Sequence, residues 1–286
     1  MRRVIAALLG LMLWGGPAPA QSLDGRLKTI QETATIKLAY RTDSRPFAYV
    51  DGPGGRPIGY SIELCERVAR HIEAELRLPK LEIKWVQVDT RTRFDAIVNG
   101  AADLECGSTT ASLSRMTLVD FSTLIYAEST GVLIKAGAGI FRFDDLAGKR
   151  IGIIPGSTNA RAIRDQLERR RLSANLVEFH DREVGVAALA RGELDGFATD
   201  KLVLLAIAQA ANLRDYVLLP DDLSFEPFAI MLPRGDWAFR LAVNAGLARV
   251  FRSGEIVELY TKYFSAFASQ PSPWIGAIFT FGALPE

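Results

Sequence analysis

The chain is poor in the side chains that most often carry metals or catalysis. Two of its 286 residues are histidine and two are cysteine, and no HExxH or CxxC spacing occurs. Zinc sites draw mainly on these residue types. The sequence also lacks a G-x-S-x-G elbow, a Walker loop and a G-x-G-x-x-G turn between a strand and a helix. We therefore expect no metal and no cofactor, and few general bases for catalysis.

An excess of charge of either sign is also missing. Lys and Arg number 34 and Asp and Glu number 33, which gives a net charge of +1. Residues 1–20 hold two arginines and no acidic residue, so the remainder carries 32 basic and 33 acidic side chains. A near-neutral chain without a basic tract argues against nucleic acid as a partner.

No hydrophobic run is long enough to cross a membrane. The longest candidate, Val4 to Trp14, has eleven residues, whereas a spanning helix needs about 20. It follows Arg2 and Arg3 and precedes Ala18-Pro19-Ala20, which is typical of a cleaved secretory signal peptide. We expect residues 1–20 to be removed, and no cysteine follows the cleavage point to carry a lipid.

The two cysteines do not form a disulfide framework. Cys65 lies in a helical pattern and Cys106 directly follows an expected strand. In an oxidising compartment they could pair, but a buried cysteine is often simply a small core residue. We expect two buried thiols.

Strands alternate with helices along the rest of the chain. TIKLAYR, LEIKWVQV and DLECGSTT are typical of strands, PFAYVDGPGGRPIGY of a hairpin, and residues 61–76 of an amphipathic helix. The pattern restarts after STGVLIKAG with KRIGIIPGST, LVEFH and GFATD. It returns to a strand at FEPFAIMLP, which a long helical stretch follows. This alternation predicts an α/β fold. We expect two similar lobes joined by two crossings.

The stretch ECGSTTASLSR, residues 105 to 115, places Ser108 and Thr110 after a strand and Arg115 shortly beyond. Hydroxyl residues at such a junction commonly cap a helix. The same geometry presents backbone N–H groups to an anion, and an arginine fork suits a carboxylate. Capping is the more common role when one such stretch stands alone.

A second hydroxyl cluster makes a ligand site the better interpretation. PGST places Ser157 and Thr158 between a strand and a helix of the second lobe. Asp200, in FATDK, ends a further expected strand, where it either caps the helix from Leu202 or receives an ammonium group. Arg115 for a carboxylate and Asp200 for an ammonium together suit a free amino acid.

With these motifs, the chain resembles the bacterial extracellular solute-binding proteins of family 3. ECGSTT with Arg115, YRTDSRPFAY, IGYSIEL, PGST and FATD carry the resemblance, and ECGSTT indicates the glutamate/aspartate-binding branch. It implies a two-lobed type II periplasmic binding protein with a ligand cleft between the lobes. Lobe 1 would comprise residues 21–130, lobe 2 residues 131–227, and the return to lobe 1 with the C-terminal tail residues 228–286.

The resemblance also implies a function. A periplasmic monomer would capture glutamate or aspartate and deliver it to a membrane-embedded ABC permease, without being an enzyme. Ser108, Thr110, Arg115, Ser157, Thr158 and Asp200 would hold the amino-acid backbone. Arg41, Thr90 and Arg93 match the positions that hold the ligand's side-chain carboxylate. Three arginines against Asp200 would then suit a ligand with two carboxylates and one ammonium.

One position departs from the family pattern. Where related proteins place a histidine in lobe 2, this chain has Arg182, with His180 two residues earlier. Either residue could face the ligand, and Arg182 would strengthen the case for an acidic one. Phe47 and Tyr60 are candidate walls for the ligand's apolar part, with core packing as the alternative. The apolar tail SQPSPWIGAIFTFGALPE is expected to pack along a lobe.

Two other functions remain open from the sequence. A cyclohexadienyl dehydratase of the same fold needs a carboxylic acid in the cleft, for which Asp181 or Glu183 would be the candidates. A ligand-sensing module that docks to a receptor is the other alternative.

Overall fold

Two sheets of the same strand pattern organise the chain. The computed structural model describes residues 23–52, 54–267 and 271–285, so the expected signal peptide lies outside the described residues. The first sheet has the spatial order β5 (Glu82–Gln87), β1 (Thr35–Tyr40), β6 (Leu104–Glu105), β13 (Glu226–Leu232) and β7 (Asp120–Glu128). The second has the order β10 (Asn175–Glu178), β9 (Arg150–Ile153), β11 (Gly196–Asp200), β8 (Thr130–Lys135) and β12 (Tyr216–Leu218).

In each sheet, parallel strands join antiparallel ones. β1 runs parallel to β5 and β6, and β13 runs antiparallel to β6 and β7. Likewise β9 runs parallel to β10 and β11, and β8 runs antiparallel to β11 and β12. We call the part built on the first sheet lobe 1 and the part built on the second lobe 2. The expected α/β architecture with two similar lobes is confirmed.

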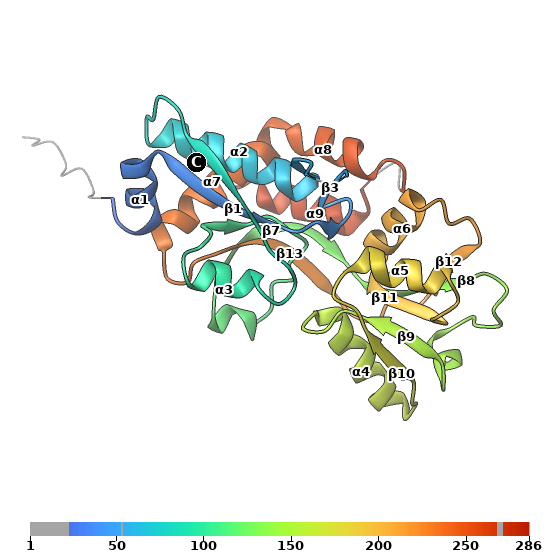
Figure 1. Cartoon of the computed structure of the whole chain (residues 1–286). Coiled ribbons are helices and arrows are strands. Elements are labelled where there is room, and N and C mark those ends of the chain that lie inside the picture. Colours follow the sequence, from blue (N-terminus) through green and yellow to red (C-terminus); the bar gives the residue numbers. More distant parts are fainter. Residues whose placement is uncertain (1–22, 53, 268–270, 286) are drawn as a thin grey trace, which may run out of the picture.

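Helices cover the sheets of both lobes (Figure 1). Lobe 1 carries α1 (Gly25–Thr33), α2 (Tyr60–Glu75), α3 (Arg93–Val98), α7 (Trp237–Ser253), α8 (Glu255–Phe264) and α9 (Pro273–Gly282). Lobe 2 carries α4 (Thr158–Arg170), α5 (Arg182–Ala190) and α6 (Lys201–Ala210). The expected hairpin is also present: β3 (Ala48–Val50) pairs with β2 (Asp43–Ser44) and β4 (Pro57–Ile58). Among the described residues, none of these helices has the length and hydropathy to cross a bilayer.

The chain passes between the lobes twice, through neighbouring strands. β7 ends at Glu128 and leads directly into β8 of lobe 2, and β13 begins at Glu226 after β12 and returns to lobe 1 (Figure 1). Glu128 and Glu226 are register partners in the antiparallel pair. Leu223 N–H donates to the Thr130 carbonyl, so the two crossings are also tied together. The expected lobe boundaries, after residues 130 and 227, stay a prediction.

Phe47 and Tyr60 are core residues rather than walls of a site. Both are fully buried, and Phe47 contacts Tyr60, Tyr126, Phe228 and Phe264 with ring centroids 5.0 to 6.1 Å apart. The Tyr60 hydroxyl donates to the Ile125 carbonyl. The core-packing alternative is therefore correct, because each ring is enclosed by other rings of lobe 1.

The expectation of two free thiols is wrong. Cys65 of α2 and Cys106, next to β6, form a disulfide with a Cα–Cα distance of 6.2 Å. The helical spacing placed Cys65 on the buried face of α2, and that face packs where β6 ends. The bond ties α2 to the start of the Gly107–Thr110 loop.

The tail packs along lobe 1, as expected. Within the described residues 271–285, α9 buries Ile275 and Phe279, and Phe279 stacks on Phe251 of α7 with centroids 5.9 Å apart.

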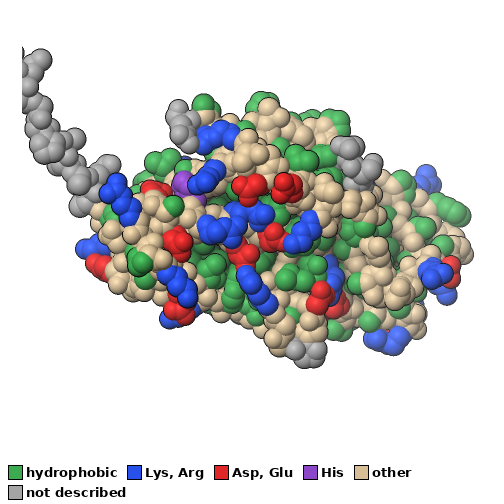
Figure 2. All heavy atoms as spheres, turned by 90° about the horizontal axis from the view of Figure 1, so that it is seen from above, with side chains coloured by type: hydrophobic (Ala, Val, Ile, Leu, Met, Phe, Trp, Pro, Cys, Tyr) green, Lys and Arg blue, Asp and Glu red, His purple; other side chains and the backbone are tan. Residues whose placement is uncertain are grey.

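Over lobe 1, Lys and Arg side chains alternate with Asp and Glu on the face shown in Figure 2. Among the ion pairs of lobe 1, Arg67 of α2 pairs with Glu63 and Glu255.

Candidate functional site between the lobes

Buried polar side chains gather where the two lobes meet. They come from the ends of β1, β6 and β11, from β2, from the N-terminal ends of α3, α4 and α5, and from both crossings. Each has at most 8% of its surface exposed, and together we call them the inter-lobe cluster: Arg41, Asp43, Ser44, Thr90, Arg93, Glu105, Ser108, Thr109, Thr110, Thr130, Ser157, Asn159, Arg182, Thr199, Asp200 and Glu226.

Arg41 is held by a carboxylate that the sequence analysis did not single out. Its Nε and Nη2 donate to Asp43, with distances of 2.7 to 3.0 Å, while its buried Nη1 has no hydrogen-bond partner. Burial would raise the pKa of Asp43, but the charges of Arg41 and Arg182 outweigh it and lower that pKa to about 2. Asp43 is therefore ionised beside Arg41 at neutral pH.

Arg93 is buried with fewer direct partners for its charge than Arg41 has. Its Nη1 donates to Thr109 Oγ1 at 2.7 Å, and that hydroxyl donates to Glu105 Oε2 at 2.6 Å. The Nε of Arg93, Oε1 of Glu105 and the hydroxyl of Thr90 are buried without a partner. Burial, and next the charge of Arg41, hold the pKa of Arg93 well below its ordinary value. Unpaired buried N–H groups on a cation are the arrangement that an added anion would satisfy.

The loop after β6 brings Ser108, Thr110 and Arg115 to the cluster without capping a helix. The element that follows is a 3-10 turn, Arg115–Thr117, that begins after Ser114, so the capping alternative is wrong for this loop. Arg115 Nη1 donates to the Thr110 carbonyl at 2.8 Å, and its guanidinium lies 5.2 Å from the Phe94 ring centroid. The Ser108 hydroxyl lies 3.3 Å from that of Ser44.

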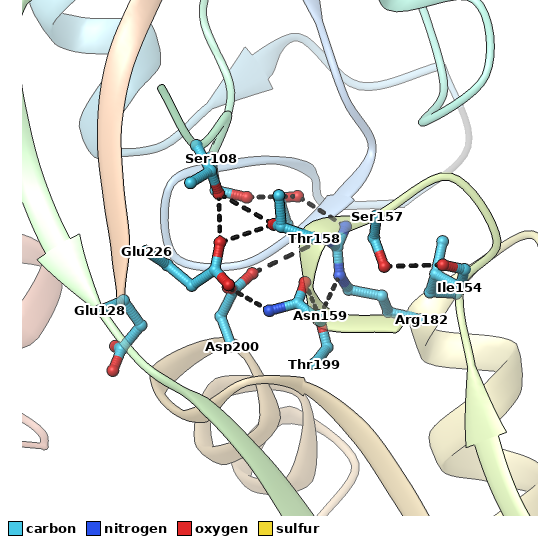
Figure 3. Close-up of polar contacts among 12 residues, drawn as sticks. Ser108, Glu128, Ile154, Ser157, Thr158, Asn159, Arg182, Thr199, Asp200 and Glu226 are labelled. Atoms are coloured by element: carbon cyan, nitrogen blue, oxygen red, sulfur yellow. Dashed lines mark hydrogen bonds and ion pairs between the residues drawn. The ribbon is translucent and has the colours of Figure 1, made fainter. Parts of the chain in front are cut away.

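Ser157 and Thr158 of lobe 2 have different roles. The Ser157 hydroxyl accepts from Ala160 N–H and donates to the Ile154 carbonyl, so it caps α4 and points toward Ile154, away from Thr158 (Figure 3). Thr158, the first residue of α4, turns its hydroxyl to within 3.1 Å of the Thr110 hydroxyl of lobe 1. Of the two, only the Thr158 hydroxyl reaches across the lobes.

Arg182, and not His180, lies in the cluster. Arg182 is 2% exposed, and its guanidinium donates to Thr199 at 2.9 Å and to Ser44 at 3.1 Å. It also pairs with Asp43 at 3.4 Å, across the lobes. Burial, and next the charge of Arg41, lower the pKa of Arg182. His180 is exposed and lines a cavity of about 240 Å³ that opens beside Asp43.

Asp200 points into the cluster instead of capping α6. Its side chain makes no capping bond; Oδ1 accepts from Asn159 at 2.8 Å and Oδ2 lies 3.7 Å from Arg182. Glu128, from the first crossing, accepts from Leu202 N–H in its place. The capping alternative for Asp200 is therefore wrong, and burial raises its pKa because the charged form is desolvated.

Sequence reasoning missed Asp43, Asn159 and Glu226. Glu226 is the most connected of the three, because it accepts from hydroxyls of both lobes and both crossings. Figure 3 shows its contact with Thr158 of lobe 2. A lone acid opening the apolar strand EPFAIML is the signal that could have found it. Asp43 lies two residues beyond the end of the expected first strand, whereas nothing in the local pattern marks Asn159.

The charge balance differs from the expected three arginines against Asp200. Arg41, Arg93, Arg182 and the partly buried Arg115 oppose four buried carboxylates, those of Asp43, Glu105, Asp200 and Glu226. Arg41 and Arg93 each retain an unsatisfied buried donor in spite of this balance. The described residues include no group of His, Cys, Asp and Glu side chains that could hold a metal ion.

Sequence comparison identifies the family. Residues 36–266 match bacterial extracellular solute-binding proteins, family 3. The chain belongs to this family. It is 35% identical to an L-glutamate/L-aspartate-binding protein of Pseudomonas aeruginosa, over 94% of this chain and 87% of that protein. It is 26% identical to a glutamate/aspartate import solute-binding protein of Salmonella typhimurium, over 92% of this chain and 89% of that protein.

Solved structures agree on the fold. A substrate-binding protein of an ABC uptake transporter from Streptococcus pneumoniae, with bound histidine, aligns with a TM-score of 0.76 at 20% identity, covering 83% of this chain and 95% of that one. An ancestral arginine-binding protein bound to arginine aligns with a TM-score of 0.72 at 22% identity, covering 81% and 98%. The fold of this family 3 member is the two-lobed type II periplasmic binding protein fold.

The residues weighed for a dehydratase lie outside the inter-lobe cluster. Asp181 caps α5 by accepting from Val184 N–H, and Glu183 pairs with Arg45 at 3.1 Å with 47% of its side chain exposed. An ancestral amino-acid-binding protein, described as a precursor of cyclohexadienyl dehydratase, aligns with a TM-score of 0.74 at 22% identity, over 84% of this chain and 100% of that one. At that identity the likeness concerns the fold alone.

Proposed function

We propose that this family 3 protein binds an acidic L-amino acid, glutamate or aspartate, in the inter-lobe cluster. The observation that carries the proposal is the set of buried, unpaired donors on Arg41, Thr90 and Arg93, in a site that also holds the buried carboxylate of Asp200. Anionic and cationic partners for one small zwitterion are thereby present together. The 35% identity to a glutamate/aspartate-binding protein supports the same ligand class.

Each part of the ligand has a chemically matched partner. The α-carboxylate lies on Arg115, with backbone N–H groups of the loop that carries Ser108 and Thr110, and of the N-terminal end of α4 at Ser157 and Thr158, beside it. The α-ammonium lies on Asp200. The side-chain carboxylate lies on Arg41, Thr90 and Arg93, with Arg182 adding positive charge from lobe 2.

The strength of such a site is adequate for uptake. Micromolar affinity corresponds to about −8 kcal/mol, and hydrogen bonds to charged groups contribute roughly 1.5–3 kcal/mol each. Several such bonds offset the cost of immobilising a small ligand. Enclosure between the lobes excludes water and strengthens each of them.

The binding protein then acts as a carrier. We infer that residues 1–20 export it to the periplasm, where it works as a monomer. The lobes close on the amino acid by hinge rotation, and the closed form delivers it to an ABC permease in the membrane. The extracellular character of the family and the likeness to a glutamate/aspartate import solute-binding protein support this assignment.

Isothermal titration calorimetry tests the proposal. Mature protein is unfolded, freed of carried-over ligand, refolded and titrated with L-glutamate, L-aspartate, L-glutamine and succinate. We expect micromolar or tighter binding of the two acidic amino acids, with glutamine and succinate at least tenfold weaker. Equal binding of glutamine would remove the side-chain roles of Arg41 and Arg93. Absence of binding by all four ligands would overturn the function and make prephenate and arogenate turnover the next assay.

A further inference from the structure

The carboxylate of Glu226 contacts hydroxyl groups from four separate segments of the chain. Its Oε2 accepts from Thr110 of lobe 1 at 2.5 Å and from Thr158 of lobe 2 at 2.6 Å. Its Oε1 accepts from Ser224 at 2.6 Å and lies 3.3 Å from the Thr130 hydroxyl, at the two crossings. Glu226 is 1% exposed, so protein groups rather than solvent surround its carboxylate. Figure 3 shows Glu226, Thr158, Asn159 and Asp200 pointing toward one another.

The number of hydroxyl hydrogens in this network fixes which atoms donate and which atoms accept. An ionised carboxylate only accepts hydrogen bonds, and each threonine hydroxyl has one hydrogen to donate. When Thr110 and Thr158 both donate to Glu226, their oxygens have only lone pairs left. These oxygens lie 3.1 Å apart, so they form an electron-rich pair that a ligand N–H group can bridge and a ligand carboxylate cannot.

Asp200 is linked to the same network. The Asn159 amide donates to Asp200 Oδ1 and to the Thr130 hydroxyl, each at 2.8 Å. Asn159 thus connects the carboxylate proposed to receive the ammonium with the hydroxyl beside Glu226. The two acids and the two lone-pair-bearing hydroxyls form one acceptor surface that includes residues of both lobes.

We propose that Glu226 is a positioning residue that makes the site selective for a ligand bearing an ammonium group, by holding the Thr110 and Thr158 hydroxyls as acceptors. The proposal rests on the amino-acid-binding function above and refines it. Thr110 and Thr158 contact the ammonium through their side chains, together with Asp200, and the α-carboxylate is left to Arg115 and backbone N–H groups. A dicarboxylate without an ammonium meets unpaired acceptors in this part of the site and is rejected.

The test compares L-glutamate with glutarate, the same dicarboxylate without the ammonium. Calorimetric and competition titrations use the wild type, Glu226→Gln and Thr158→Val. The amide introduced by Glu226→Gln has nearly the same shape as the carboxylate but carries an N–H donor and no charge. We expect glutamate affinity to fall at least tenfold in each variant while glutarate affinity changes less than twofold. The double variant should lose no more glutamate affinity than the weaker-binding single variant. Both substitutions disrupt the same feature, the hydrogen bond by which Glu226 orients the Thr158 hydroxyl, so their effects should not add.

The outcomes separate the two proposals. Equal losses for glutamate and glutarate, or no loss for either, would overturn the positioning role of Glu226 and leave the proposed function standing. Additive losses in the double variant would also overturn it, since the two residues would then act independently. If the wild type binds neither acidic amino acid, the proposed function itself fails. Should Glu226→Gln not fold by circular dichroism, Thr110→Val and Thr158→Val carry the same glutamate-to-glutarate comparison.

Discussion

At the residue scale, the arginines of the inter-lobe cluster differ in how well their charges are already compensated. Arg41 forms a bidentate pair with Asp43, whereas Arg93 donates one hydrogen bond to a neutral hydroxyl and has an unpaired Nε. Because Arg93 is 3% exposed, water cannot supply the missing partner. A ligand carboxylate should therefore gain most from Arg93.

Replacing Arg93 should weaken acidic ligands selectively. For Arg93→Met we expect glutamate affinity to fall by about 3 kcal/mol, the upper range for a hydrogen bond to a charged group, and glutamine affinity to change much less. Calorimetry of both ligands measures this. Arg91→Met is the matched control, because Arg91 lies two residues away with 62% of its side chain exposed. Equal losses of affinity for glutamate and glutamine would show that Arg93 does not bind the side-chain carboxylate.

A second residue-scale prediction concerns Glu128, at the end of β7. Burial raises its pKa from 4.5 to about 7, and the charge of Asp200 adds to the shift. The folded protein therefore holds this proton more tightly than the unfolded chain does. The cost of ionising Glu128 is absent below about pH 4.5 and grows until the pH exceeds about 7. Once Glu128 is fully ionised, this cost in folding free energy is at most about 3 kcal/mol, and solvent screening reduces it.

Glu128→Gln should remove this dependence. The free energy of unfolding of the variant, relative to the wild type, should increase between pH 5 and pH 8, as measured by urea unfolding at each pH. The amide side chain of the variant stays neutral and can still accept from Leu202 N–H. Glu82→Gln, an exposed acid on β5, serves as the control and should show no such trend. A constant difference between Glu128→Gln and the wild type at all pH values would contradict the raised pKa.

At the element scale, the disulfide between α2 and the end of β6 positions the loop that carries Ser108 and Thr110. Its two cysteines are 41 residues apart in the chain, and closing a loop of that length stabilises a protein by about 4 kcal/mol in the chain-entropy model. We expect Cys65→Ala/Cys106→Ala to lose a large part of this in urea unfolding and to bind glutamate more weakly, because the loop is less restrained. Unchanged stability and affinity would show that packing alone holds the loop.

Most elements could be predicted from the sequence because their periodicity is local. The helix over 61–76 matches α2, and the strand over 81–88 matches β5, since alternation and helical spacing reflect burial of one face. The disulfide could not be predicted in this way, because pairing depends on how α2 packs on the sheet. Local patterns could not by themselves decide between capping and a role in the site: Asp200 and Thr110 have residue types that suit both, and tertiary contacts turn both into the site.

At the scale of the whole molecule, the two lobes are joined by contacts between their side chains as well as by the two crossings. Arg182 of lobe 2 pairs with Asp43 of lobe 1, and Glu183 of lobe 2 pairs with Arg45 of lobe 1. The Arg182–Asp43 pair is almost fully buried, so losing one partner leaves an uncompensated charge between the lobes. The closed arrangement should therefore depend on Asp43.

Asp43→Asn should open the unliganded protein. Arg41 and Arg182 would then face each other as buried like charges, and separating the lobes relieves the repulsion. We expect small-angle X-ray scattering to give a larger radius of gyration for the unliganded variant than for the unliganded wild type above pH 4, where Asp43 is ionised. Asp222→Asn is the control, since Asp222 pairs with Lys201 within lobe 2. Identical radii for all three proteins would contradict the role of Asp43 in closure.

The most direct test of the central claim is a crystal structure of the mature protein with L-glutamate. We expect the ligand to be enclosed between the lobes, with its ammonium on Asp200 and the Thr110 and Thr158 hydroxyls. The α-carboxylate should lie on Arg115 and the side-chain carboxylate on Arg93 and Arg41. A glutamate bound outside the inter-lobe cluster, or one whose side-chain carboxylate lies away from Arg41 and Arg93, would contradict the claim.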